Sequence, residues 1–564
     1  MTPSPGWPSA ASSASRPAPV WGGDLPAAGI VILATVVCVA TVGGWTGWSV
    51  LREPLWAWCA LALAVAAGGS LLVRAGRAHV PRGGFAALLL PLPASSVVAV
   101  TVVGVVRGAP RGLEWFLNGD HPRHVVYVAD TWAQGSLTYA VDGYPRGWHS
   151  LLATLWTLSG AGLDAEHVLR LLELMGAASL LLSASLALAL AHTGHALAGR
   201  LGLSSRASIV VGVVVSALSL LNVFLANYQA LGYENSLLAA LAVVVCCREV
   251  LLRAGTALSL VTTASAVVVV AHAWQLLLPS VVLPALWCAG VAWRSGLGRR
   301  RLVVALLACA TLVFAGPGVL AVVTGVGLDH AAEPGPDSPV PLVLLVMGLG
   351  ASLLLGLASR DWPTRCIGAV NALPAATALA LALSLGVGPL HYYPSKLLWQ
   401  AALLSLPALG VAIAAAAVGA VRRIGVVLLF GRVLAVLGAV VSVYALALPW
   451  GAQVGAWSTV DGGRVVTALA TPRAEEAVVV WLEGSPTTDS VTRILLDAFR
   501  VESTRARVPQ ARTTVGEECA LLRTASRPLV LSTADEEQVS ARYACDGAVI
   551  VEVLRVSPRT TGHR

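Results

Sequence analysis

Long apolar runs separated by short polar segments make up most of the first 450 residues. Each run is roughly 17 to 25 residues long, the length that an α-helix needs to cross the hydrocarbon core of a bilayer. The pattern predicts a polytopic α-helical membrane protein with about 13 transmembrane helices. The predicted spans are 28–50, 55–73, 84–106, 168–192, 206–226, 232–252, 257–272, 275–293, 301–325, 340–358, 366–386, 396–420 and 425–449.

A weaker apolar segment, 146–160, decides the topology. Arginine clusters between the runs mark the cytoplasmic side, and with a cytoplasmic N-terminus they all fall there only if 146–160 does not cross. We therefore expect a helix at the outer interface, anchored by Trp148, within an external loop over 107–167. The clusters are Arg74, Arg77 and Arg82; Arg200 and Arg206; Arg248 and Arg253; Arg294, Arg299, Arg300 and Arg301; Arg360 and Arg365; and Arg422, Arg423 and Arg432.

The flanking regions differ from the transmembrane domain, 28–450. Residues 1–27 are rich in Pro, Ser and Ala and lack a basic region, which predicts a disordered cytoplasmic tail. An odd number of spans places 451–564 outside the cell. There 477–484, 527–533 and 547–555 are predicted as strands and 491–500 as an amphipathic helix, giving a small extracytoplasmic α/β domain. In an oxidising compartment, Cys519 and Cys545 could form a disulfide there.

Composition agrees with the membrane assignment. The chain is 57% hydrophobic and 12% charged, with a mean hydropathy of +0.77, whereas soluble proteins have about 25% charged residues. Because the basic residues of the first 450 positions lie mostly between apolar runs, the net charge of +8 reflects topology. Membrane lipids are therefore expected partners, and nucleic acid is not.

Polar residues are concentrated on the predicted outer side, above all in the stretch 119–149. Carboxylates there can accept a proton from a hydroxyl, cations can hold phosphate, and aromatic rings can stack on sugars. Asp120 is the candidate general base, although an Asp before His-Pro is equally suited to begin a helix. The other candidates in this stretch are expected to bind substrate or phosphate: His121, His124, Arg123, Tyr144, Arg146 and His149.

A second polar group begins the predicted span at 396–420. It contains His391, Tyr392, Tyr393 and Lys396, the only lysine in the chain. A compact ammonium suits a lipid phosphate, whereas a lysine at a helix end can also simply extend toward the interface. Secondary candidates at the outer ends of other spans are Glu234, His272, Asp329 and His330. No metal ligands and no cofactor are assigned, with a divalent cation left open.

These motifs resemble those of a known class of enzymes. Many spans, an acidic residue early in a large external loop, a YPRGWH segment and a late YYPSK resemble the GT-C class of multi-pass glycosyltransferases. Within it, the chain is similar to the actinobacterial cell-wall arabinofuranosyltransferases. The resemblance implies a polyprenyl-phosphate sugar donor, Asp120 as general base, and Lys396 with Tyr393 at the donor phosphate.

We therefore expect an inverting glycosyltransferase in the cytoplasmic membrane. It would move a sugar from the polyprenyl phosphate to a cell-envelope glycan or lipid-linked acceptor on the outer face, and Lys396, with Arg123 or Arg146, would neutralise the departing phosphate. One alternative is a transporter or flippase of a lipid-linked saccharide, which predicts charges at the membrane midplane. The other is a non-catalytic envelope scaffold, which would leave the polar loop without a role.

Overall fold

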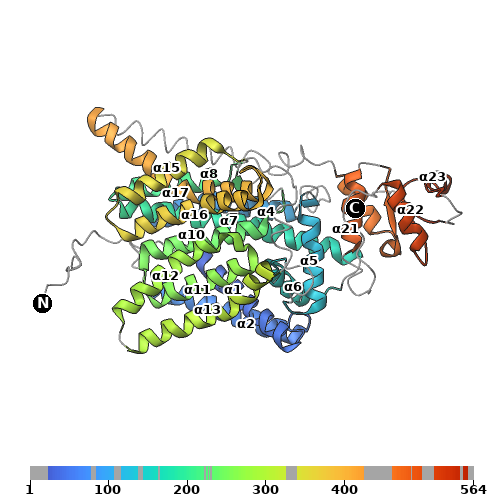
Figure 1. Ribbon diagram of the computed structural model, residues 1–564, viewed down its shortest axis with the longest axis horizontal. Coiled ribbons are helices and arrows are strands. Elements are labelled where there is room, and N and C mark those ends of the chain that lie inside the picture. The colour runs from blue at the N-terminus through green and yellow to red at the C-terminus, as the bar shows by residue number, and fades with distance from the viewer. Residues whose placement is uncertain are drawn as a thin grey trace.

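A bundle of apolar helices forms most of the molecule (Figure 1). The computed structural model describes residues 23–77, 84–106, 116–117, 119–137, 144–162, 165–221, 224–225, 228, 231–296, 298–324, 340–424, 460–483, 486–497, 514–545 and 551–556. The helices of the bundle are α1 (Leu25–Thr46), α2 (Pro54–Arg77), α3 (Gly84–Leu89), α4 (Leu92–Val106), α5 (His121–Gln134), α6 (Gly147–Leu158), α7 (Ala165–Arg200), α8 (Ser205–Ser219), α10 (Glu234–Arg253), α11 (Ala257–Ala273), η3 (Gln275–Leu277), α12 (Leu278–Ser295), α13 (Gly298–Thr324), α15 (Leu342–Ala358), α16 (Trp362–Leu385) and α17 (Tyr392–Ile424).

The chain is a polytopic helical membrane protein. Within the described residues, eight helices are long and apolar enough to cross a bilayer, and Ser205–Ser219, Ala257–Ala273 and Leu342–Ala358 are shorter apolar helices. The predicted span 84–106 is divided between α3 and α4, and 425–449 lies outside the described residues. The count of thirteen spans therefore stays a prediction. One boundary was wrong: residues 25–27, assigned to the disordered tail, belong to α1.

Burial divides the helices into central and peripheral ones. In the most apolar part of α10, 94% of the residues are buried inside the protein, against 17% for α13. Because a lipid-facing surface can stay as apolar as a core, exposed leucines and valines on α13 are what a membrane helix at the edge of a bundle requires. The central helix α10 packs against α7, α11 and α12.

The segment 146–160 forms the short helix α6. Its 12 residues cover about 18 Å, which is less than the hydrocarbon thickness of about 30 Å, so α6 is too short to cross a bilayer. The helix packs against α1, α2, α5 and α11. Trp148 is 6% exposed, so the expectation that it anchors the protein at the lipid interface was wrong. Its indole ring packs in the protein interior.

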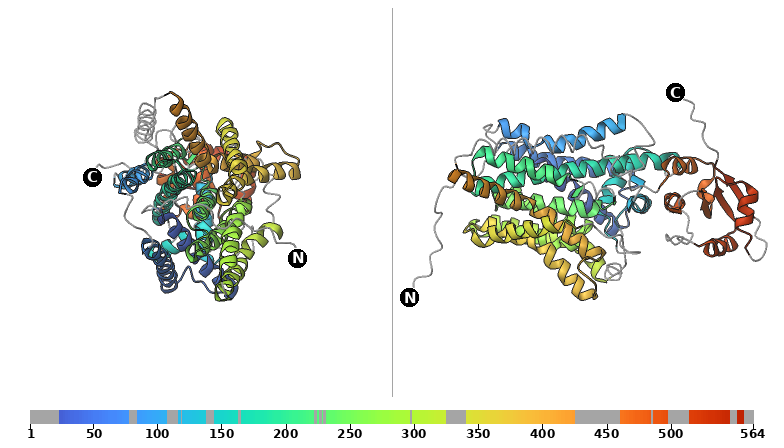
Figure 2. Two further views of the ribbon diagram at one scale, coloured as in Figure 1. Left: turned by 90° about the vertical axis from the view of Figure 1, so that its left-hand side faces the viewer. Right: turned by 90° about the horizontal axis from the view of Figure 1, so that it is seen from above.

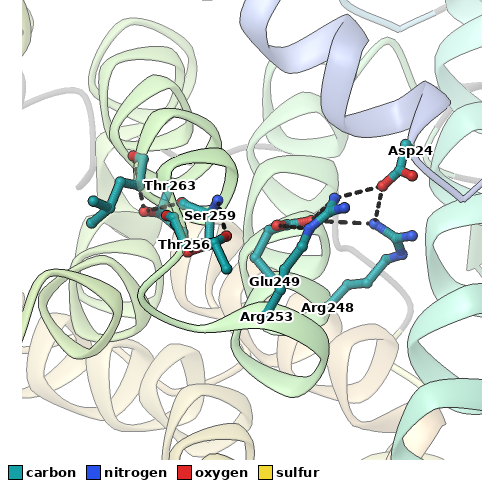
Figure 3. Close-up of polar contacts among 8 residues, drawn as sticks. Asp24, Arg248, Glu249, Arg253, Thr256, Ser259 and Thr263 are labelled. Atoms are coloured by element: carbon teal, nitrogen blue, oxygen red, sulfur yellow. Dashed lines mark hydrogen bonds and ion pairs between the residues drawn. The ribbon is translucent and has the colours of Figure 1, made fainter. Parts of the chain in front are cut away.

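A cluster of four charged residues, three of them buried and Arg253 half-buried, joins the start of α1 to the end of α10 (Figure 3). Arg248 Nη1 donates to Asp24 Oδ1 at 2.8 Å, and Arg253 Nη2 donates to the same oxygen at 2.5 Å. Glu249 accepts two further hydrogen bonds from Arg253. Burial alone raises the pKa of Asp24, but the two guanidinium groups outweigh it and hold the pKa of that carboxyl below its ordinary value.

This cluster marks one end of the bundle. Glu234 and Arg253 are the first and last residues of the 20-residue helix α10, so they lie about 28 Å apart along its axis. Arg200, at the end of α7, donates to the Leu251 carbonyl and to Asp361 at the same end as Arg253. Helices α5 and α6 lie toward the other end (Figure 1).

A small parallel sheet follows the bundle in the chain. The three strands lie in the order β1 (Val479–Trp481), β2 (Leu529–Ser532) and β3 (Glu552–Arg555), at the positions expected from sequence. The surrounding helices are α20 (Gly462–Leu469), η4 (Ala474–Glu476), α21 (Pro486–Asp497), α22 (Val515–Thr524) and α23 (Glu536–Arg542). Cys519 and Cys545 form a disulfide.

This C-terminal region lies against the end of the bundle that carries α5. Helix α21 contacts α5 directly, and both belong to one continuous group of buried apolar side chains. The right-hand view of Figure 2 shows the red elements of this region beyond one end of the bundle.

The four-charge cluster gives a stability prediction. Replacing Asp24 by Ala leaves the buried Arg248 and the half-buried Arg253 without one of their two carboxylates, and breaking a buried pair costs about 3–5 kcal/mol. We expect Asp24→Ala to lower the melting temperature in detergent, measured by tryptophan fluorescence. Glu173→Ala removes an exposed carboxylate and serves as the control. Equal melting temperatures for both variants would show that the cluster does not stabilise the bundle.

Candidate functional site

The site begins with a contact between two glycine-containing backbone segments. Gly119 and Gly232 both have positive φ, +60° and +74°. A Cβ on Gly119 would lie 2.3 Å from the Leu231 carbonyl oxygen, and a Cβ on Gly232 would lie 2.6 Å from the His121 nitrogen. Only glycine fits there without displacement. The contact lets the Asp120 N–H donate to the Leu231 carbonyl at 2.9 Å, which brings the start of α5 against the start of α10.

Glu234 lies at this junction, fully enclosed. Its Oε1 is 2.9 Å from His121 Nδ1 and accepts a hydrogen bond from Ser179 Oγ at 2.9 Å. Its Oε2 is 3.6 Å from His124 Nε2, which also lies 2.7 Å from the Gly232 carbonyl oxygen. Histidines three residues apart on a helix face the same side, so α5 presents both imidazoles to one carboxylate.

A second layer extends from His124 to α6. His124 Nδ1 lies 2.8 Å from His149 Nε2, and the two rings stack. Burial lowers the pKa of His124, although Glu234 opposes it. Burial lowers the pKa of His149 further, and the nearby His124 and Arg146 add to that effect. Both histidines are therefore neutral at pH 7, and one donates its proton to the other.

Tyrosines cover this layer. Tyr144 stacks on Tyr127 with ring centroids 4.3 Å apart, and its hydroxyl accepts a hydrogen bond from Asn235 Nδ2 at 3.3 Å. Burial raises the pKa of Tyr144 well above its ordinary value, so the phenol stays neutral. The rings of Tyr127 and Tyr144 lie beside His149.

Asp120 lies outside this closed network. It occupies the N-cap position of α5, but its side chain makes no capping hydrogen bond. Instead, Oδ2 accepts a hydrogen bond from the Tyr392 hydroxyl at 3.4 Å, and Lys396 Nζ donates to that hydroxyl at 2.6 Å. Helix α5 therefore begins directly after Asp120, while the carboxylate is directed to Tyr392 and not to the helix backbone. Asp120 is half-buried, so it remains within reach of a ligand.

Lys396 is surrounded by aromatic rings. Its Nζ lies 3.4 Å from the ring centroid of Tyr233, 3.9 Å from that of Tyr392 and 5.4 Å from that of Tyr393. The lysine is 7% exposed, so it does not extend into the interface as a free side chain. The rings stabilise a desolvated ammonium by cation–π attraction.

The two arginine candidates differ in surroundings. Arg123 is exposed on the first turn of α5, between the buried residues His121 and His124. Arg146 is buried, with Nη2 3.4 Å from Asp130 Oδ2 and its guanidinium over the Tyr127 ring. Of the two, only Arg123 presents its charge at the surface.

The remaining candidates are more distant or outside the described residues. His391 is half-buried just before α17. His272 packs beside Gly147, but its Nε2 lies 2.6 Å from the Phe314 carbonyl oxygen on α13, so it is not part of the His124 and His149 layer. Asp329 and His330 lie outside the described residues.

Tyr127, Asn235 and Ser179 belong to this site but were absent from the sequence-based candidates. Tyr127 lies one helical turn from His124 on the same face, and this spacing could have identified it. Asn235 directly follows the candidate Glu234 at the start of an apolar run. Ser179 has no distinguishing signal, since it is one of several serines within its apolar helix.

The arrangement is suited to proton transfer and anion binding at a membrane surface. Among the described residues there is no group of three or more His, Cys, Asp or Glu side chains that could hold a metal ion. Comparison of the chain with protein families, with curated proteins and with solved structures finds no match. Only the geometry of the site therefore bears on the function of the protein.

The buried histidines predict a pH dependence of stability. Because their folded-state pKa values lie below the ordinary value of 6.5, unfolding takes up protons at acidic pH. Their contribution to stability is complete above about pH 6.5 and is lost as pH falls, by about 1.4 kcal/mol per pH unit for each histidine. Melting temperatures should thus decrease from pH 7 to pH 5.

His149→Gln, which cannot titrate, should make this decrease shallower. His167→Gln removes a histidine outside the cluster and is the control. A decrease equally steep in His149→Gln and the unchanged protein would exclude His149 as a source of the pH dependence.

Proposed function

We propose that this protein is an inverting membrane glycosyltransferase that uses a polyprenyl-phosphate sugar. The observation that carries the proposal is the half-buried Asp120 carboxylate, which is oriented by Tyr392 at the end of an apolar helix bundle. A carboxylate held outside the closed Glu234 network can accept a proton, whereas Glu234 is occupied by its partners. The acceptor would be a cell-envelope glycan or lipid-linked saccharide.

In the proposed reaction, Asp120 takes the proton of the acceptor hydroxyl. The oxygen of that hydroxyl attacks the anomeric carbon of the donor sugar. The bond from that carbon to the phosphate oxygen breaks, and the electron pair leaves with polyprenyl phosphate. Arg123 is exposed on the first turn of α5, three residues after Asp120, and would place a cation beside the leaving phosphate. The N-terminus of the 14-residue helix α5 adds a favourable dipole for an anion.

The outer face of the membrane is the proposed location of the reaction. The disulfide between Cys519 and Cys545 supports an oxidising compartment for the C-terminal region, which contacts α5 beside the site. The arginine-bearing ends of α7 and α10 lie at the other end of the bundle, which suits the cytoplasmic side. Both observations favour an extracytoplasmic site.

A transfer assay tests the reaction. Purified protein in nanodiscs would be given a panel of polyprenyl-phosphate sugars with an envelope-glycan acceptor, and release of polyprenyl phosphate would be measured. Because general bases contribute about 10²- to 10⁴-fold to rate, we expect Asp120→Asn to reduce turnover by at least about 100-fold. Glu53→Gln, which alters an exposed carboxylate, is the control. Full turnover by Asp120→Asn would exclude Asp120 as the base, and movement of donor between leaflets without transfer would favour a flippase.

Reporter fusions test the orientation. A reporter enzyme that needs disulfides to fold should be active when fused after Val556 and inactive when inserted after Arg253. The reverse result would place the site on the cytoplasmic side.

A further inference from the structure

We infer that Lys396 is a positioning residue, which acts through the Tyr392 hydroxyl to orient the Asp120 carboxylate and does not bind the donor phosphate itself. The kinetic part of this inference rests on the proposed function, whereas its structural part does not. In this arrangement the Tyr392 hydroxyl links Lys396 to the Asp120 carboxylate by hydrogen bonds.

The Lys396 ammonium is enclosed by tyrosine side chains. The Tyr392 oxygen accepts one of its three N–H bonds at 2.6 Å, and the rings of Tyr233 and Tyr392 lie within 4 Å of Nζ. A phosphate oxygen would have to approach Nζ to about 2.7–2.9 Å to form a charge-assisted hydrogen bond. With the residue only 7% exposed, that approach requires displacement of a tyrosine ring.

The hydrogen bonds run in one direction, from Lys396 through Tyr392 to Asp120. Tyr392 and Lys396 are four residues apart on α17, so their side chains lie on one face of the helix. Lys396 Nζ donates to the Tyr392 oxygen, and the same hydroxyl donates to Asp120 Oδ2. A cation that donates to a hydroxyl polarises it and strengthens the hydrogen bond that the hydroxyl donates. The chain of bonds holds Oδ2, and Oδ1 is then the oxygen that receives the acceptor proton.

The backbone of Lys396 is held by buried aromatic residues. The Tyr228 hydroxyl donates to the Lys396 carbonyl oxygen at 3.1 Å, and Tyr228 stacks on Trp399, which is fully buried. A ligand-binding lysine benefits from a mobile stem, whereas a positioning lysine requires a fixed one. A lysine ammonium is a compact point charge, which suits a hydrogen bond to the single Tyr392 hydroxyl.

Because Lys396 is the only lysine, its reactivity can be measured in the intact protein. The rate of acylation by acetic anhydride would be followed by peptide mass spectrometry, with Arg299→Lys supplying an exposed reference amine in the same molecule. We expect Lys396 to react at least about tenfold more slowly than the reference, because burial protects it. Polyprenyl phosphate should leave the rate unchanged. The inference would be overturned if Lys396 were acylated as fast as the reference amine and if polyprenyl phosphate slowed the acylation of Lys396.

Two tyrosine variants make the labelling specific. Tyr392→Phe removes the oxygen that holds the ammonium, so Lys396 should react several-fold faster than in the unchanged protein. Tyr543→Phe is the control, because it removes a tyrosine hydroxyl that donates to Glu518 in the C-terminal region, and it should leave the labelling rate of Lys396 within about twofold. Identical labelling in the unchanged protein and Tyr392→Phe would contradict the proposed contact.

Kinetics separate positioning from phosphate binding. Lys396→Met and Tyr392→Phe should each lower kcat by about 10- to 100-fold with little change in KM for the donor, and the double variant should be no slower, because both act through one chain of bonds. Melting temperatures within a few degrees of the unchanged protein would exclude loss of folding. A raised donor KM with unchanged kcat in Lys396→Met would instead assign phosphate binding. If no donor supports transfer, the proposed function fails, while the labelling still decides whether Lys396 is closed to phosphate.

Discussion

A charge buried in an apolar helix bundle has to be paired, and α10 carries such charges at both of its ends. Glu234 begins the helix with a carboxylate that two histidines and Ser179 surround, and Arg248 and Arg253 end it beside Asp24 and Glu249. Leaving any of these groups without a partner would cost several kcal/mol. The requirement fixes α5 and α7 against one end of α10 and the start of α1 against the other. The central helix α10 thereby fixes the positions of α5, α7 and the start of α1 relative to one another.

This pairing separates the polar residues near α5 into two groups with different properties. His121, His124, His149 and Glu234 are buried, and short polar contacts join His121 to Glu234 and His124 to His149. A closed network of this kind is rigid, because every shift would break a hydrogen bond that water cannot replace. At the start of the same helix, Asp120 is half-buried and Arg123 is exposed. The buried group thus provides a fixed support, and the more accessible group is available for chemistry.

The proposed chemistry depends on this support. A general base must keep one orientation while the acceptor approaches, and a few tenths of an ångström matter for proton transfer. The backbone contact between Gly119 and the Leu231–Gly232 turn fixes the start of α5, and Tyr392 fixes one oxygen of the carboxylate. The aromatic side chains around Lys396 allow a charge to be kept near the base without water.

The sequence by itself determined the membrane class, the positions of most helices and the three C-terminal strands, because hydrophobic length and alternation are local properties. It also identified Asp120, Glu234, Lys396 and the histidines as exceptional, since polar groups are rare beside apolar runs. It could not reveal that Trp148 is buried, that Arg146 pairs with Asp130, or that Ser179 bonds to Glu234. Those facts depend on which helices meet, and partners separated by 16 to 55 residues leave no periodic signal. Only the tertiary structure, which brings positions 120, 234 and 392 together, decided which polar groups support one another and which stay accessible.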